Sequence, residues 1–204
     1  MPTASALAAS EPGFGRALLA FALWVSLASA LAAPHRAAAL ELSEIRLGVW
    51  SNDVAFTGRS GLSFPNPFRH RREGGANLNV ELLLVSPGIL HVIGAPRPRA
   101  GVSINTSGAT NDVYVDLDWR YDFRFGLFGE AGLGGLWHDG ELRDAPGRSE
   151  LGSRFLFHES LELGWRLRDR YDLSLAWEHM SNASLARPNQ GIDRFGLRLG
   201  WRLQ

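Results

Sequence analysis

The chain has 204 residues, 21 basic and 21 acidic side chains, and no cysteine. This length fits one domain of ordinary size, and a net charge of zero argues against nucleic acid as the main partner. The lack of cysteine excludes a thiol nucleophile, a cysteine-bound zinc site and a disulfide framework.

The N-terminal 39 residues have the pattern of a secretory signal peptide. Arg16 precedes an uncharged apolar segment, Ala17–Ala33, which ends among alanines and Pro34. A basic flank, a short apolar core and small residues at its end are typical of a leader removed on export. Cleavage after Ala33 or after Ala39 fits this pattern, and a retained signal anchor is the alternative. We predict a signal peptide within residues 1–39 and a mature domain over residues 40–204.

The mature domain is predicted to be all-β. Strand-like alternation of apolar and polar residues recurs along it, and no segment after the leader has a convincing helical period. Tight polar turns separate several of the segments, so consecutive strands are expected to be antiparallel. The eight predicted strands are Glu44–Ala55, Ala76–Ser86, Arg99–Asn105, Asp112–Trp119, Phe125–Trp137, Ser153–Leu167, Tyr171–Ser181 and Gly191–Leu203.

Large apolar residues share one face of these strands, and charges of both signs share the other. In the last strand, for example, Leu197, Leu199 and Trp201 alternate with Arg198 and Arg202. A membrane barrel would turn the apolar face to lipid and pair the charges in a filled interior. A soluble lipocalin-like barrel would instead expose the charges and line a ligand cavity with aromatic residues. The alternation alone does not separate these two architectures.

Strand length and loop length favour the membrane. Several segments reach the length of about 9–11 residues that a tilted transmembrane strand needs. Tryptophans near the segment ends could form aromatic girdles. Short turns at Arg120–Arg124 and Arg168–Arg170 alternate with longer loops, as in bacterial outer-membrane barrels. The sequence therefore predicts an eight-stranded antiparallel transmembrane β-barrel. Its outer loops are expected at Phe56–Gly75, Thr106–Asn111, His138–Gly152 and Asn182–Gln190.

Polar side chains interrupt the apolar face where the last two strands meet. His179 and Ser181 are two residues apart, so they share a face, and a hairpin places Asp193 opposite one of them. A serine hydroxyl becomes a nucleophile when a base takes its proton, and a carboxylate orients that base. This arrangement indicates a catalytic triad on the outer wall of the barrel. The alternative is a rim of polar residues where the strands leave the membrane.

The residues around this triad resemble a known family. The run His179–Asn182, followed by Pro188-Asn189 and Gly191 and then by a closing strand, is similar to the lipid A 3-O-deacylase (PagL) family. Phe155-x-Phe157 also matches. Members are eight-stranded outer-membrane barrels that hydrolyse the ester-linked hydroxyacyl chain at position 3 of lipid A.

The resemblance implies a role for each residue of the motif. Ser181 would be the nucleophile, His179 the general base and Asn182 an oxyanion-hole donor. Asp193 holds the position of the acid, where the family usually has a glutamate.

The implied partner is lipid A, or lipopolysaccharide, in the bacterial outer membrane, with the site toward the outer leaflet and no cofactor or metal. A homodimer is compatible with this architecture. The rival functions are a non-enzymatic structural or adhesive barrel, an acyltransferase and, less favoured, a soluble carrier.

Glu159 is a second candidate for the acid. If the Arg168–Arg170 turn closes the preceding hairpin, antiparallel pairing puts Glu159 beside His179 on the outward face. A carboxylate on a lipid-facing wall is costly unless it is paired or lies near the interface. Glu159 is therefore either a rim residue or an orienting partner of His179.

One outer loop carries a dense basic run, Phe68–Arg72. Guanidinium groups bind phosphate with two hydrogen bonds, and lipid A carries phosphates. Arg69, Arg71 and Arg72 are therefore candidate phosphate contacts, although solvated loop charge is the commoner use of such a run.

Overall fold

The computed structural model describes residues 41–59 and 62–203. The predicted signal peptide lies outside these residues. No helix in the described part of the chain is long and apolar enough to cross a membrane.

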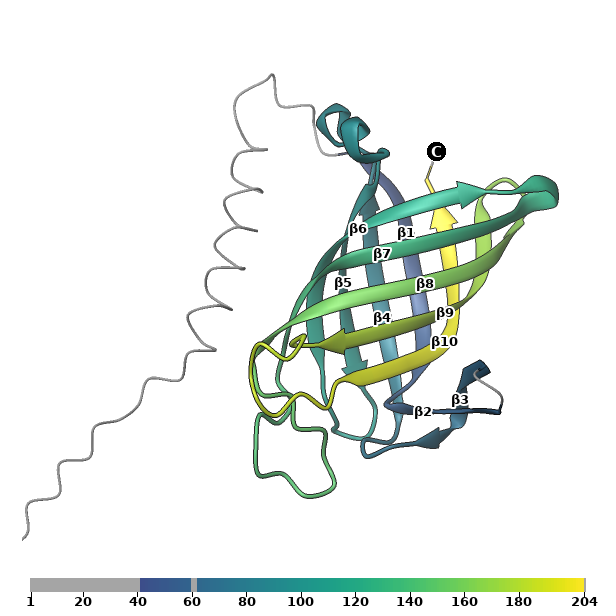
Figure 1. Cartoon of the computed structure of the whole chain (residues 1–204). Coiled ribbons are helices and arrows are strands. Elements are labelled where there is room, and N and C mark those ends of the chain that lie inside the picture. The colour runs from purple at the N-terminus through teal and green to yellow at the C-terminus, as the bar shows by residue number, and fades with distance from the viewer. Residues whose placement is uncertain (1–40, 60–61, 204) are drawn as a thin grey trace, which may run out of the picture. The chain divides into compact units, whose positions relative to one another are not determined.

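Eight strands close into an antiparallel barrel in the order β1-β10-β9-β8-β7-β6-β5-β4 (Figure 1). The closure is made by β1, which pairs with β10 on one side and with β4 on the other. The predicted eight-stranded antiparallel barrel is confirmed, with bounds that differ from the sequence expectation by a few residues. The strands are β1 (Leu42–Ser51), β4 (Ala76–Leu84), β5 (Arg97–Asn105), β6 (Asp112–Asp122), β7 (Leu127–His138), β8 (Phe155–Leu167), β9 (Tyr171–Ser181) and β10 (Ile192–Arg202).

The two ends of the barrel differ in their connections. We call the end at which β1 begins and β10 finishes the turn end, and the opposite end the loop end. At the turn end, β4 and β5 are joined through the 3-10 helix η1 (Gly88–Ile93), and β6 and β7 through η2 (Arg124–Gly126). The long loops gather at the loop end, where β9 finishes and β10 begins (Figure 1).

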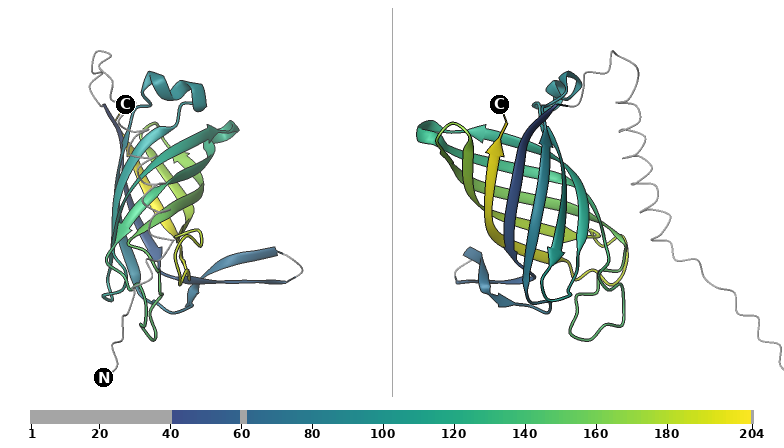
Figure 2. Two further views of the ribbon diagram at one scale, coloured as in Figure 1. Left: turned by 60° about the vertical axis from the view of Figure 1, so that its left-hand side comes forward. Right: turned by 180° about the vertical axis from the view of Figure 1, so that it is seen from behind.

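The predicted loop Phe56–Gly75 was wrong in one respect, because it contains a hairpin. Strands β2 (Val54–Arg59) and β3 (Leu62–His70) pair with each other outside the barrel. The hairpin projects sideways from the loop end (Figure 2). Pro65 and Pro67 concealed β3 in the sequence. A proline is tolerated here because both strands of a two-stranded sheet are edge strands.

The barrel turns its apolar side chains outward. Leu47, Val115 and Leu163 are 56%, 60% and 58% exposed, and similar residues cover the other strands. An exposed apolar band of this extent suits contact with hydrocarbon and would be unfavourable in water. The lipocalin-like alternative is therefore wrong, because it requires the reverse orientation.

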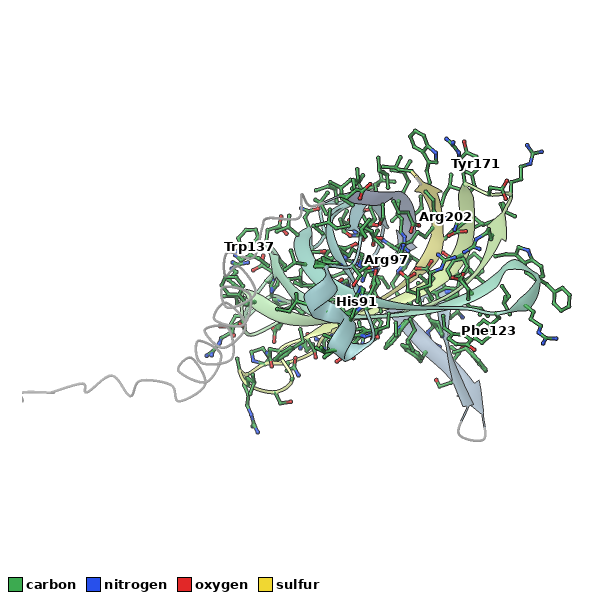
Figure 3. The ribbon with its side chains drawn as sticks, turned by 90° about the horizontal axis from the view of Figure 1, so that it is seen from above. His91, Arg97, Phe123, Trp137, Tyr171 and Arg202 are labelled. Atoms are coloured by element: carbon green, nitrogen blue, oxygen red, sulfur yellow. The ribbon has the colours of Figure 1, made fainter. Side chains whose placement is uncertain are left out.

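The charged face points inward, where opposite charges pair. Arg46 lies 2.8 Å from Glu44 and 2.6 Å from Glu130, and Arg198 lies 2.6 Å from Glu81. Figure 3 looks down on the barrel from the turn end and places Arg97 within the ring of strands, with Trp137 and Tyr171 at its periphery. Pairing compensates the desolvation of these charges. The paired side chains fill the barrel interior.

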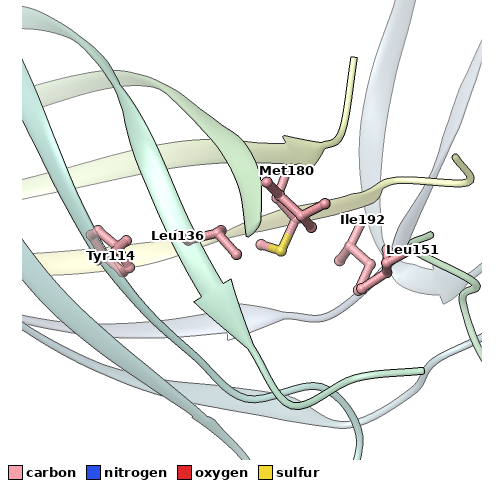
Figure 4. Close-up of a cluster of buried hydrophobic side chains, with 6 residues drawn as sticks. Tyr114, Leu136, Leu151, Met180 and Ile192 are labelled. Atoms are coloured by element: carbon pink, nitrogen blue, oxygen red, sulfur yellow. The ribbon is translucent and has the colours of Figure 1, made fainter. Parts of the chain in front are cut away.

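A small apolar cluster fills the interior near the loop end (Figure 4). Met180 and Ile192 belong to this cluster and face each other across β9 and β10. Their neighbours along the chain, His179, Ser181 and Asp193, therefore point outward. The cluster is Tyr114, Leu136, Leu151, Leu156, Met180 and Ile192.

Candidate active site

The site is built on the register of β9 and β10, which pairs His179 with Asp193 directly. His179 Nδ1 lies 2.9 Å from Asp193 Oδ1. An ionised carboxylate only accepts hydrogen bonds, so Nδ1 carries the proton in this contact and Nε2 is left as the basic nitrogen. The pair has the chemistry of a general base with its orienting acid.

Trp177 supports this pair and was not predicted to belong to the site. Its indole Nε1–H donates to Asp193 Oδ1 at 3.1 Å, and its ring stacks on the imidazole of His179 with 5.9 Å between centroids. Phe56 of the β2–β3 hairpin packs edge-on against the same indole. The available signal was the i, i+2 spacing of Trp177 and His179 on one face of a strand.

Arg71 also reaches the site, where it contacts carboxylates, whereas the sequence predicted a contact with phosphate. Its Nη2 lies 2.9 Å from Asp193 Oδ2 and 2.7 Å from Asp53 Oδ1. The guanidinium is thus engaged by two carboxylates, and its predicted contact with phosphate stays a prediction. Arg69 and Arg72 are exposed at the loop end, and their contact with phosphate stays a prediction.

Ser181 shares the outward face with His179 and is partly exposed. The backbone N–H of Ala183 lies 3.4 Å from Ser181 Oγ. In the described part of the chain no hydrogen bond joins Ser181 to His179. Contacts of this kind often form only when substrate is bound. Gly191 packs against both residues, because a Cβ at Gly191 would lie 3.2 Å from His179 Cε1 and 3.5 Å from Ser181 Cβ.

The structure gives Asn182 a structural role in place of the predicted oxyanion contact. Its side-chain amide donates to the carbonyl oxygens of Leu151 at 2.8 Å and Pro188 at 3.0 Å. Its backbone N–H donates to Asn189 Oδ1 at 3.0 Å. Every N–H group of Asn182 therefore has a partner within the loops, and the side chain is buried. The sequence motif could not distinguish a donor to substrate from a donor to the loop itself.

Glu159 occupies the predicted register position beside His179 on β8 and is exposed. Of the two candidate acids, Asp193 makes the hydrogen bond with His179, and no hydrogen bond or ion pair of Glu159 is found among the described residues. Both carboxylates are cross-strand neighbours of His179, so the strand register does not decide which of them contacts the imidazole. The direction of the side chains decides it.

The comparisons with known proteins address the same segment. A family model described as lipid A 3-O-deacylase (PagL) matches residues 100–202, which is half of the chain and contains His179, Ser181 and Asp193. The chain belongs to the PagL family. The protein is therefore an outer-membrane β-barrel, and it belongs to a family of hydrolases named for lipid A.

A solved structure shares the fold. The crystal structure of the outer membrane enzyme PagL covers 78% of this chain and 99% of its own, with 17% identity and a TM-score of 0.56. Neisserial surface protein A covers 78% of this chain and 96% of its own, with 9% identity and a TM-score of 0.47. No curated protein sequence matches the chain.

Among the described residues, no group of three or more His, Asp or Glu side chains is placed so that it could hold a metal ion.

Proposed function

We propose that the protein is a lipid A 3-O-deacylase, a serine esterase that removes the ester-linked hydroxyacyl chain at position 3 of lipid A. The observation that carries this proposal is the His179–Asp193 pair, with its 2.9 Å contact, on the outward face of the barrel two residues from Ser181. Membership of the PagL family supports the substrate class.

The placement of the site suits a substrate that is itself part of the membrane. In bacterial outer-membrane barrels the short turns face the periplasm and the long loops face outward. The loop end, with His179 and Ser181 at the finish of β9, then lies at the level of the outer leaflet, where lipid A resides. Its acyl chains would lie along the exposed leucines and valines of the wall, and the ester would meet Ser181 without entering the barrel.

The reaction follows from the assigned roles. Ser181 Oγ attacks the ester carbonyl carbon while His179 Nε2 takes the hydroxyl proton. When the tetrahedral intermediate collapses, the bond to the 3-oxygen of the sugar breaks and His179 returns the proton to that oxygen. Water then attacks the acyl-enzyme, giving a proton to His179, and release of the hydroxy acid restores the Ser181 hydroxyl.

The oxyanion contact falls to the backbone of the loop after Ser181, since the N–H groups of Asn182 are already occupied. The N–H of Ala183 is directed at Ser181 Oγ, at 3.4 Å. A small rotation of the serine side chain would leave this N–H for a developing oxyanion. A backbone donor of this kind is typically worth about 10²- to 10³-fold in kcat.

Mass spectrometry of lipid A tests the proposal. We expect expression in a bacterium whose lipid A retains the 3-O-acyl chain to remove one hydroxyacyl group. Ser181→Ala and His179→Ala should each abolish that loss, on the order of 10⁴-fold or more in rate. Ser63→Ala, an exposed serine on β3, is the matched control.

Unchanged lipid A with a correctly inserted wild-type barrel would instead support the non-enzymatic alternative. Appearance of the acyl group on another lipid would identify an acyltransferase.

A further inference from the structure

We propose that Arg71 is a positioning residue of this site, which holds Asp193 in the orientation that serves His179. This inference rests on the proposed esterase function. It concerns a side chain that lies far from the triad in the sequence and enters from the segment that follows the β2–β3 hairpin.

Asp193 is held through both of its carboxylate oxygens. Oδ1 accepts from His179 Nδ1 at 2.9 Å and from Trp177 Nε1 at 3.1 Å. Oδ2 lies 2.9 Å from Arg71 Nη2. A carboxylate fixed at one oxygen only can still rotate about its last bond, whereas contacts at both oxygens fix its plane. Asp193 is only 5% exposed, so water cannot easily replace the Arg71 contact.

Arg71 is itself anchored by Asp53. Its Nε donates to Asp53 Oδ1 at 2.9 Å and its Nη2 lies 2.7 Å from the same oxygen, while Nη2 also donates to the Gly191 carbonyl oxygen at 3.3 Å. Asp53 is fully buried, and its Oδ2 accepts the backbone N–H groups of Arg72 and Glu73. The guanidinium therefore joins a rigid carboxylate in one loop to the acid of the site.

The charge of Arg71 matters as well as its shape. Asp53 and Asp193 each place an oxygen within hydrogen-bond distance of the same Nη2. Without a cation between them the two carboxylates would repel each other at short range in a partly buried site. Only the contacts of His179 and Trp177 with Oδ1 would then hold Asp193, and we expect its carboxylate to rotate out of the orientation that serves His179.

The experiment compares Arg71→Met, which keeps the length of the side chain without its charge, with Arg71→Lys. Both are made in the full chain inserted in the outer membrane and measured by the rate of lipid A deacylation. Arg143→Met is the control, because Arg143 is an exposed arginine at the same end of the barrel. We expect Arg71→Met to lower kcat about 10- to 100-fold with little change in KM, as for other residues that orient a reacting group. Arg71→Lys should keep part of the rate, and Arg143→Met all of it.

A double-mutant cycle separates positioning from a general structural role. If Arg71 acts through Asp193, adding Arg71→Met to Asp193→Asn should cost little further rate. Full additivity would overturn the proposal, and so would an unchanged kcat. A raised KM alone would assign Arg71 to substrate binding instead. Loss of the folded barrel in both Arg71 variants, judged by heat-dependent gel mobility, would show a structural role and also overturn it.

Failure of the proposed function is distinguishable from failure of this inference. A wild-type protein that deacylates nothing refutes the esterase, yet the contact remains measurable by NMR. The Nδ1–H resonance of His179 should then be present in the wild type and in Arg143→Met. In Arg71→Met it should be weakened or lost, and its persistence there would overturn the positioning role.

Discussion

Asp193 is the residue on which the side chains of the site converge. Hydrogen bonds from His179 and Trp177 and an ion pair with Arg71 reach it. Strand parity and a closed hairpin predicted that Asp193 lies opposite His179 or Ser181. The sequence could not predict the contacts of Trp177 and Arg71, because nothing in a period-two pattern says which way an indole or a guanidinium will turn.

The competition between Asp193 and Glu159 gives a first prediction. Asp193→Asn should lower kcat by about 10²- to 10⁴-fold, since an amide no longer favours the Nδ1–H tautomer of His179 or the imidazolium formed in the reaction. Glu159→Gln, which removes the other cross-strand carboxylate, should leave the rate within about a factor of three. Deacylation kinetics on membrane lipid A measure both variants. A large loss of deacylation rate in Glu159→Gln would show that Glu159 also acts in the site.

Gly191 gives a second prediction, about close packing. Its φ is +59°, and an added Cβ would lie 3.1 Å from the Met180 carbonyl oxygen and 3.2 Å from His179 Cε1. Gly191→Ala should therefore lower deacylation, because the imidazole has to shift from its position between Ser181 and Asp193. Gly147→Ala is a matched control, with φ at +80° and nothing within 4 Å of the added atom. Both substitutions share a backbone cost of about 1 kcal/mol. Equal rates for the two variants would show that Gly191 serves only the turn.

At the scale of elements, the loops of the loop end are tied together by buried carboxylates. Glu73, in the segment between β3 and β4, accepts the backbone N–H groups of Thr110 and Ser149 at 3.1 Å each and lies 3.1 Å from Arg148 Nε. Segments far apart in the sequence thus meet at one side chain. Local propensity could not predict this arrangement, since it depends on which loops the barrel brings to the same end.

This carboxylate gives a prediction about pH. Burial alone would raise the pKa of Glu73, but the hydrogen bonds from Thr110, Arg148 and Ser149 lower it below the usual value of 4.5. A lowered folded-state pKa means that Glu73 stabilises the loops above pH 4.5 and loses this contribution as the pH falls through its folded pKa.

The protection factors of the Thr110 and Ser149 amides, which compare their exchange rates with those of an unstructured chain at the same pH, should therefore fall on acidification in the wild type. In Glu73→Gln these protection factors should be lower already at neutral pH, with a flatter acid dependence. Glu141→Gln, an exposed carboxylate in a neighbouring loop, should behave as the wild type. An unchanged acid dependence in Glu73→Gln would assign the effect to another group.

The β2–β3 hairpin shows where the pattern failed at this scale. The predicted loop Phe56–Gly75 contains Pro65 and Pro67, which argue against a strand inside a sheet but not against an edge. The hairpin brings Phe56 against Trp177 and leads into Arg71, so the failure also concealed part of the site.

At the scale of the whole molecule, the question was which face of the strands points outward. Buried arginines such as Arg46, Arg99 and Arg198 pair with acidic residues from other strands, and the leucines face out. Closing the sheet into a barrel makes the burial of these charges favourable, because opposite charges from non-adjacent strands meet across the interior. The sign of each charge could be read from the sequence, but its partner could not.

The sequence by itself determined the eight barrel strands, their antiparallel order and the shared parity of His179, Ser181 and Asp193, because these follow from alternation and from turns a few residues long. Only the tertiary structure decided which face is outward, which carboxylate contacts His179, and that Arg71 and Trp177 support it. Those outcomes depend on contacts such as that between Arg71 and Gly191, which are 120 residues apart and meet only when the barrel closes.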